Sequence, residues 1–319
     1  MGSDRRRSRR PLVVGVALAA VAVLLAVGIA AAMWHAPAWT AGPSAPSTAA
    51  PSQSRSPSAS GAASGDHVVT VQAAGRSRTM IVHLPLGTPK EPLPLVLVFH
   101  GAGDTAEGTA ASTDFERVAD QRGLIVAFLQ GYQNTWNEGA GHTPAEVAGV
   151  DDVAFARAAV QTIEGMRSID HERIAAVGFS NGALLADLLG CRMADMVRLI
   201  VPVSGPLPVS VSQSCRPSRP VSVFEVHGTA DDSIPYGGGP FAGIGGGTTV
   251  LSAPDAVARW AALDGCDSHA SQTSASGGIR ISAYTGCPAG ISVQLRTVEG
   301  GGHAWPADIG ELVAGALGE

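Results

Sequence analysis

The 319-residue sequence is poor in charged residues, in aromatic residues and in cysteine, of which it has four. It contains no C-x-x-C spacing, and its first cysteine is Cys191. The missing C-x-x-C spacing argues against a zinc site. Residues 11–33 are an apolar run, and no cysteine follows closely behind it, which excludes a lipid-modified cysteine at that place. The sequence also has no internal repeat, and we expect neither a metal nor a cofactor.

Positive charge is scarce in the C-terminal four fifths of the chain. Residues 67–319 carry 15 Lys and Arg against 25 Asp and Glu, a formal charge of −10. An acidic surface repels phosphate backbones and anionic headgroups. This part of the chain is therefore not expected to bind nucleic acid or to adhere to anionic surfaces.

The N-terminus has the opposite composition. Five arginines lie within residues 1–10, and residues 11–33 contain no charged side chain. An uncharged run of this length can cross the ~30 Å hydrocarbon core of a bilayer as a helix. Basic residues in front of the run predict that the rest of the chain lies outside. We expect residues 1–35 to be a retained signal-anchor helix or, as the alternative, a cleaved signal peptide.

Two further zones follow. Residues 36–66 consist mainly of Pro, Ser, Ala and Gly, which offer too little apolar surface to fold, so they predict a disordered linker. Residues 67–319 have the length of one large domain.

All four cysteines lie in this outer domain, beyond the export signal. An even number in that setting predicts disulfides. Of the three possible pairings we predict the one that joins neighbours in the sequence, Cys191–Cys215 and Cys266–Cys287.

Strand and helix patterns alternate through residues 67–319. Two alternating apolar segments predict an antiparallel hairpin at 67–85, and continuous apolar runs predict buried strands at 94–101, 123–129 and 173–179. Asp151 is a good N-cap for a helix. This alternation predicts a mainly parallel sheet with helices on both faces. The other predicted elements are helices at 113–122, 151–166, 181–194 and 254–263 and strands at 197–205, 220–228, 278–285 and 291–299.

A G-x-S-x-G sequence lies at residues 178–182, centred on Ser180. The pattern alone carries little information in a chain with 40 Gly and 28 Ser. Its position between a buried strand and a helix is the setting of a nucleophile elbow, in which the small flanking residues permit a sharp turn. We therefore predict that Ser180 is a nucleophile rather than a turn serine between two glycines.

A serine nucleophile needs a base, and the base needs an orienting acid. His303 is the preferred base because it follows the last predicted strand in a glycine-rich loop. His269 lies in a polar loop, and His227 at a strand end is expected to brace its turn. Asp231 and Asp232 both follow that strand, and spacing does not separate them.

Two backbone N–H groups are expected to form an oxyanion hole. Asn181 directly follows the predicted nucleophile, and Ala102 lies in "VFHGAGD" after an early buried strand. His100 in the same segment is expected to hold this loop through its ring nitrogens.

Six blocks together resemble a known family: "VFHGAG", "WNEG", "VDDVAF", "IAAVGFSNGALLA", "VHGTADDSIPYGGG" and "VEGGGHAWP". In content and order they are similar to the secreted polyhydroxybutyrate depolymerase and feruloyl/acetylxylan esterase family of α/β-hydrolases, over about residues 67–306. The resemblance implies an α/β-hydrolase fold and a serine esterase. It also implies Ser180 as nucleophile, His303 as base and Asp231, rather than Asp232, as acid.

The family pattern further implies Ala102 and Asn181 as oxyanion donors and two-step acyl transfer on carboxylic esters. We expect the ester to be a hydroxyalkanoate oligomer or a feruloyl or acetyl ester. Four residues in loops beside the blocks are candidates for contact with the substrate or for packing: Trp136, Asn137, Tyr236 and Trp305.

Two alternatives stay open at this point. The same triad would serve an envelope acyltransferase, and a hydrolase scaffold would also serve a non-catalytic binding protein. The expected partners are the ester substrate and, if the N-terminal helix is retained, the membrane. The chain departs from the family pattern after His303, where the C-terminal end is short, and we expect this to open the cleft or loosen the loop of the base.

Overall fold

The computed structural model describes residues 62–87, 90, 92–243 and 247–318. The predicted signal helix at 1–35 and most of the predicted linker at 36–66 lie outside the described residues. Within the described ranges, no helix combines the length and the apolar character needed to span a bilayer.

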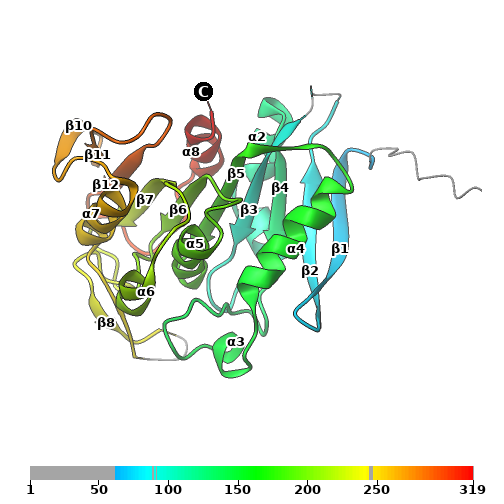
Figure 1. The fold of residues 1–319 in the computed structure, drawn as a ribbon, viewed down its shortest axis with the longest axis horizontal. Coiled ribbons are helices and arrows are strands. Elements are labelled where there is room, and N and C mark those ends of the chain that lie inside the picture. The colour runs from blue at the N-terminus through cyan, green and yellow to red at the C-terminus, as the bar shows by residue number, and fades with distance from the viewer. Residues whose placement is uncertain (1–61, 88–89, 91, 244–246, 319) are drawn as a thin grey trace, which may run out of the picture. The chain divides into compact units, whose positions relative to one another are not determined.

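A ten-stranded mixed sheet forms the centre of the domain (Figure 1). Strands β4, β3, β5, β6, β7 and β12 are parallel to one another, whereas β1 and β2 at one edge and β11 and β10 at the other are paired antiparallel. The predicted mainly parallel sheet is therefore correct for the centre, and the edges make the sheet mixed. In spatial order the strands are β1 (Gly65–Ala73), β2 (Arg76–Leu84), β4 (Ile125–Leu129), β3 (Leu93–Phe99), β5 (Ile169–Phe179), β6 (Leu199–Val203), β7 (Ser222–Gly228), β12 (Val293–Val298), β11 (Ile279–Tyr284) and β10 (Ala270–Ser276).

At each edge, one antiparallel pair of strands is joined by a tight turn. Gly75 has φ 76° in the turn between β1 and β2, and Gly277 and Gly278 have φ 59° and 79° between β11 and β10. A two-residue turn can only join antiparallel strands, while parallel strands require a crossover. Strand β10 was not predicted because its residues, "ASQTSAS", are small and mostly polar. A separate two-stranded sheet pairs β8 (Gly239–Phe241) with β9 (Thr248–Val250).

Helices cover both faces of the sheet. Phe155 of α4, Leu185 of α5 and Trp260 of α7 belong to the core on one face, and Figure 1 shows these three helices in front of the sheet. Phe115 of α2 and Val313 of α8 belong to the core on the other face. The helices are α1 (Ala106–Ser112), α2 (Phe115–Arg122), α3 (Pro144–Val147), α4 (Asp152–Glu164), α5 (Asn181–Arg192), α6 (Val209–Ser214), α7 (Ala253–Asp264) and α8 (Ile309–Ala316).

Several local predictions are confirmed. Asp151 caps α4, and its side chain accepts a hydrogen bond from the N–H of Ala154 at 2.8 Å. Both predicted disulfides are present, Cys191–Cys215 with an S–S distance of 1.99 Å and Cys266–Cys287 with 2.06 Å. The first joins the ends of α5 and α6, and the second joins the end of α7 to the loop before β12.

The short C-terminal end still forms a helix, α8. The N–H of Gly310 donates to Asp114 at 2.7 Å, and Glu311 forms ion pairs with Arg117 and Arg122 of α2 at 3.3 and 3.0 Å. Closer to His303, Asp308 pairs with Arg296 at 3.0 Å. Residues 308–311, which follow the predicted base, are therefore attached to the domain through Asp308 before Ile309 and through Gly310 and Glu311 after it.

Candidate active site

Ser180 lies at the turn between β5 and α5. Its backbone has φ 55° and ψ −119°, a region that residues with a side chain rarely occupy. The N–H of Ser180 donates to the carbonyl of Val203 at 2.9 Å, so the turn is fixed against the end of β6. A serine held in such a conformation between strand and helix is a nucleophile elbow in shape.

The two glycines of the G-x-S-x-G sequence are required by close backbone contacts. A Cβ on Gly178 would lie 1.9 Å from the carbonyl oxygen of Gly182. A Cβ on Gly182 would lie 2.2 Å from the carbonyl oxygen of Phe99. Both approaches involve backbone atoms that cannot move without distorting a strand or a helix, so any larger residue would prevent this turn.

Asp231 and His303 are joined directly. The Nδ1 of His303 lies 2.8 Å from Oδ2 of Asp231, whose carboxyl is buried. Oδ1 of Asp231 accepts the N–H groups of Ser233 and Ile234, each at 2.9 Å. Asp232 is exposed. The aspartate that contacts the histidine is therefore Asp231.

The carboxyl of Asp231 is ionised. Burial opposes its charge, but hydrogen bonds from His227 and His303 and from the backbone N–H of Ile234 outweigh burial and hold the pKa of Asp231 well below its usual range. A permanent carboxylate at this point fixes the Nδ1–H tautomer of His303 and leaves Nε2 as the basic nitrogen.

The loops that carry these residues contact one another at the carboxyl ends of the central strands. The N–H of Ala230 donates to the carbonyl of Gly301 at 2.9 Å, which ties the Asp231 loop to the His303 loop. The ring of His303 lies 4.7 Å from that of Phe179, the residue before Ser180. Ser180, Asp231 and His303 therefore lie on neighbouring loops at the carboxyl ends of the central strands.

The loop after β3 lies beside the elbow. A Cβ on Gly101 would lie 2.9 Å from the ring of Phe179 and 3.6 Å from Cβ of Ser180. His100 holds this loop: its Nδ1 lies 2.8 Å from the carbonyl of Gly101, and its Nε2 accepts the N–H of Gly131 at 2.9 Å. Burial lowers the pKa of His100, so this ring is neutral. Its contacts match the holding role expected from the sequence.

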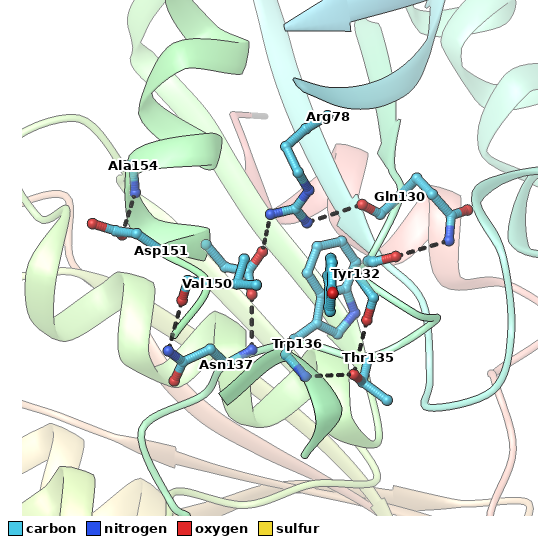
Figure 2. Close-up of polar contacts among 12 residues, drawn as sticks. Arg78, Gln130, Tyr132, Thr135, Trp136, Asn137, Val150, Asp151 and Ala154 are labelled. Carbon is cyan, nitrogen blue, oxygen red and sulfur yellow. Dashed lines mark hydrogen bonds and ion pairs between the residues drawn. The ribbon is translucent and has the colours of Figure 1, made fainter. Parts of the chain in front are cut away.

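Trp136 connects the loop after β3 to the start of α5. Its indole N–H donates to the carbonyl of His100 at 2.8 Å, and its backbone N–H donates to Oδ1 of Asn181, also at 2.8 Å. The ring is completely buried. Figure 2 shows Arg78 beside this ring, where its guanidinium donates to the carbonyl of Gln130 at 3.0 Å.

The other residues predicted near the substrate also have protein partners. Asn137 donates its backbone N–H to Asp152 at 2.8 Å and its side-chain N–H to the carbonyl of Val150 at 2.7 Å (Figure 2). The hydroxyl of Tyr236 lies 2.9 Å from that of Thr297. These contacts fix the side chains of Asn137 and Tyr236 within the domain.

Trp305 lies against the aromatic side chain before the serine. It stacks on Phe179 with ring centroids 5.2 Å apart, and both rings are partly exposed. These two rings form an apolar surface beside His303.

Two buried acidic groups near the site were not predicted from the sequence. Glu225 lies on β7 beside His227, the histidine expected to brace its turn, and Glu138 lies in the loop after Trp136. Burial raises the pKa of Glu138 to about 8, so its carboxyl is neutral at pH 7. The sequence did contain a sign of Glu225, because this acidic residue lies inside the otherwise apolar strand "SVFEVHG" and not on a solvent-exposed face.

One group among the described residues has a geometry that could hold a metal ion. Asp66, His83 and Glu116 place ligand atoms within 4.8 Å of one another. Both ring nitrogens of His83 already contact carboxylates, from Asp66 at 2.6 Å and Asp120 at 3.1 Å. His83 is therefore held by ion pairs with Asp66 and Asp120.

Comparison with solved structures defines the class of fold. The acetyl xylan esterase from Aspergillus awamori superimposes with a TM-score of 0.55 at 13% identity, covering 75% of this chain and 94% of that one. The ten-stranded mixed sheet is therefore that of an α/β-hydrolase-like fold.

Sequence comparison gives the family. The family model described as esterase PHB depolymerase matches residues 78–208, a range that includes Ser180 and ends before Asp231. The putative esterase NocK of Nocardia uniformis subsp. tsuyamanensis is 32% identical over 252 residues, which are 74% of this chain and 73% of that protein. The chain belongs to the esterase PHB depolymerase family, a family of carboxylic ester hydrolases.

A second relative is longer than this chain. Feruloyl esterase B of Piromyces equi is 31% identical over 235 residues, which are 71% of this chain and 42% of that protein. The match thus spans less than half of that relative.

Proposed function

We propose that this protein is an extracytoplasmic serine esterase that hydrolyses carboxylic esters with Ser180, Asp231 and His303. The observation that carries the proposal is the 2.8 Å contact between His303 Nδ1 and the buried carboxylate of Asp231. This contact lies at the carboxyl ends of the central strands, where Ser180 forms its strained turn. This is the orientation that a general base requires.

The proposed reaction has two steps. Nε2 of His303 removes the hydroxyl proton of Ser180 as its oxygen attacks the ester carbonyl, and the same proton passes to the leaving alcohol. Water activated by His303 then releases the acid and restores Ser180. The backbone N–H groups of Ala102 and Asn181 stabilise the oxyanion, an interaction that removes roughly 3–4 kcal/mol from the barrier in other hydrolases. Neither N–H group has an acceptor among the described residues.

The substrate is proposed to be a feruloyl or acetyl ester or a hydroxyalkanoate oligomer. The names of the family and of its relatives support these three classes. The partly exposed rings of Phe179 and Trp305 support an apolar group beside His303. Tyr236 and Asn137 stay predictions as substrate contacts. For Trp136, whose ring is completely buried, we propose a positioning role instead.

The central test is replacement of the nucleophile. Ser180→Ala is expected to lower kcat on a p-nitrophenyl ester by at least about 1,000-fold, with an unchanged circular dichroism spectrum. Ser204→Ala is the matched control, because Ser204 has φ 53° at the end of the neighbouring strand and is also a serine at a strained turn. Wild-type turnover by Ser180→Ala would exclude the serine mechanism.

A panel of aryl butyrate, methyl ferulate, acetylated xylan and a hydroxybutyrate trimer, assayed with wild type, then ranks the ester classes. Negligible turnover of all four esters would contradict the proposed esterase activity.

The proposed location outside the cytoplasm is supported by the two disulfides, which persist in oxidising compartments. Anchoring through residues 1–35 stays a prediction. Protease added to intact cells should degrade the catalytic domain, and survival of the domain would contradict the proposed location.

A further inference from the structure

A second histidine, His227, also contacts the proposed catalytic acid. Its Nε2 lies 2.9 Å from the carbonyl oxygen of Ile234 and 3.4 Å from Oδ2 of Asp231, the same oxygen that accepts the hydrogen bond from His303. A carbonyl oxygen can only accept a hydrogen bond, so Nε2 of His227 carries a proton. Oδ2 of Asp231 thus accepts a hydrogen bond from His303 and also lies within ion-pair distance of His227.

The other ring nitrogen of His227 faces a buried acid. Nδ1 lies 3.7 Å from Oε1 of Glu225, and both residues are 1% exposed. Neither of these two atoms has any other partner in the described part of the chain. An unprotonated nitrogen facing an ionised carboxylate would leave a buried charge without compensation, which is costly. A proton must therefore lie on the pair.

The surroundings place that proton on His227. Burial opposes the charge of His227, but its contacts with the carboxylates of Asp231 and Glu225 outweigh burial and raise the pKa of His227 to about 9. Burial also raises the pKa of Glu225, while the contact with His227 lowers it. His227 faces two carboxyl groups, whereas Glu225 faces one imidazole, so the geometry favours the proton on His227. The ring of Tyr236 lies 5.7 Å from this imidazole, edge-on. At neutral pH His227 is therefore an imidazolium.

Two further titratable side chains lie on the neighbouring elements. On α5, burial and then the charge of Glu225 raise the pKa of Asp187 well above its usual range, so Asp187 is neutral. On β12, Thr297 is the register partner of His227, and the adjacent Arg296 points to the other face of the sheet, where it pairs with Asp308. The pair from β7 is thus the source of positive charge behind Asp231.

We propose that Glu225 and His227 form a positioning pair that holds a cationic N–H group toward Asp231 and thereby sets the charge that Asp231 presents to His303. A carboxylate that already neutralises one cation stabilises a second cation less. We therefore expect removal of the positive charge of this pair to move the acid limb of the pH–rate profile. This inference rests on the proposed function, because it assumes that His303 is the general base.

Glu225→Gln is the most informative variant. The amide has the shape of the carboxylate and can donate a hydrogen bond to Nδ1, so His227 becomes neutral while its Nε2–H contacts are kept. The acid limb of the kcat/KM profile is expected to move upward by about one pH unit. Below that limb, activity falls about tenfold relative to wild type, while the alkaline plateau changes little.

Nitrogen-15 spectra of the histidine rings give a readout that does not depend on activity. Wild-type His227 should show two protonated ring nitrogens at pH 7, and Glu225→Gln should show only one. A singly protonated His227 in the wild type would overturn the proposal.

His227→Gln is the second variant, because its side-chain amide can replace the Nε2–H donor without the charge. It should move the acid limb in the same direction as Glu225→Gln. Asp264→Asn is the control: burial raises the pKa of this carboxyl to about 7, and it accepts the N–H of Val221 at the far end of β7, so its loss should leave the acid limb in place.

A folded Glu225→Gln enzyme with an unshifted acid limb would overturn the inference and leave the triad intact. Activity retained by Ser180→Ala would instead overturn the proposed function. The two failures are therefore distinguishable.

Discussion

At the scale of single residues, Trp136 has the most consequential contacts near the elbow. It touches both segments that carry the proposed oxyanion donors, through His100 on one side and Asn181 on the other. Its own position is set by the carbonyl that accepts the hydroxyl of Thr143 at 2.7 Å and by the neighbouring guanidinium of Arg78. The distance between the two donors thus depends on one buried indole.

Trp136→Phe is expected to lower kcat by roughly tenfold with little change in KM, because one hydrogen bond of about 1–1.5 kcal/mol positions a group that acts in the transition state. Steady-state kinetics on an aryl ester measure both constants. Trp260→Phe is the control: its indole is equally buried and donates to Asp187 at 2.8 Å, away from both oxyanion segments. An unchanged kcat in a folded Trp136→Phe enzyme would argue against the positioning role.

At the scale of elements, the antiparallel edge of the sheet is joined to α2 by one histidine. His83 on β2 contacts Asp66 of β1 through Nδ1 at 2.6 Å and Asp120 of α2 through Nε2 at 3.1 Å. Burial lowers the pKa of His83, but hydrogen bonds and charge from the two aspartates outweigh burial, so the net shift is upward. Only the imidazolium can donate to both carboxylates at once.

The stabilising effect of His83 is therefore present below its unfolded pKa of about 6.5 and is lost as pH rises through the higher folded value. We expect the free energy of unfolding of wild type to fall by roughly 1 kcal/mol more than that of His83→Gln over this window, since Asp66 is partly solvated. Urea unfolding at a series of pH values measures the difference. Parallel pH dependence in the two proteins would show that the histidine does not stabilise this edge.

At the scale of the whole molecule, the two disulfides stabilise different regions. Cys191 and Cys215 are 5% and 1% exposed and join the helix that follows Ser180 to α6, whereas Cys266 and Cys287 are partly exposed. Each bridge closes a loop of moderate length, with sequence separations of 24 and 21. Closing a loop of this length lowers the entropy of the unfolded chain and so raises the free energy of unfolding by about 3 kcal/mol.

Thiol reductant is expected to open Cys266–Cys287 first, because access controls thiol exchange, and to lower the free energy of unfolding by about 3 kcal/mol per bridge. Alkylation followed by peptide mass mapping identifies the first cysteines released, and urea unfolding gives the loss of stability. A double variant, Cys266→Ser with Cys287→Ser, should reproduce the first step alone. Simultaneous release of all four thiols would contradict this order.

The sequence by itself determined the buried parallel strands, the cap at Asp151 and the two disulfide pairs, because each is written in local periodicity or in the order of a few cysteines. It also predicted the elbow, since strand, turn and helix are consecutive there. The polar edge strand β10 and the short helices were missed because their local pattern is weak and their stability comes from neighbours.

Only the tertiary structure decided which side chains meet across long sequence separations. The contact of Asp231 with His303 joins residues 72 positions apart, and that of Trp136 with Asn181 joins residues 45 apart. It also revealed Glu225 and His227 as a buried pair behind the acid. No spacing rule along the chain predicts such contacts, because they depend on how the central strands and the loops at their carboxyl ends pack together.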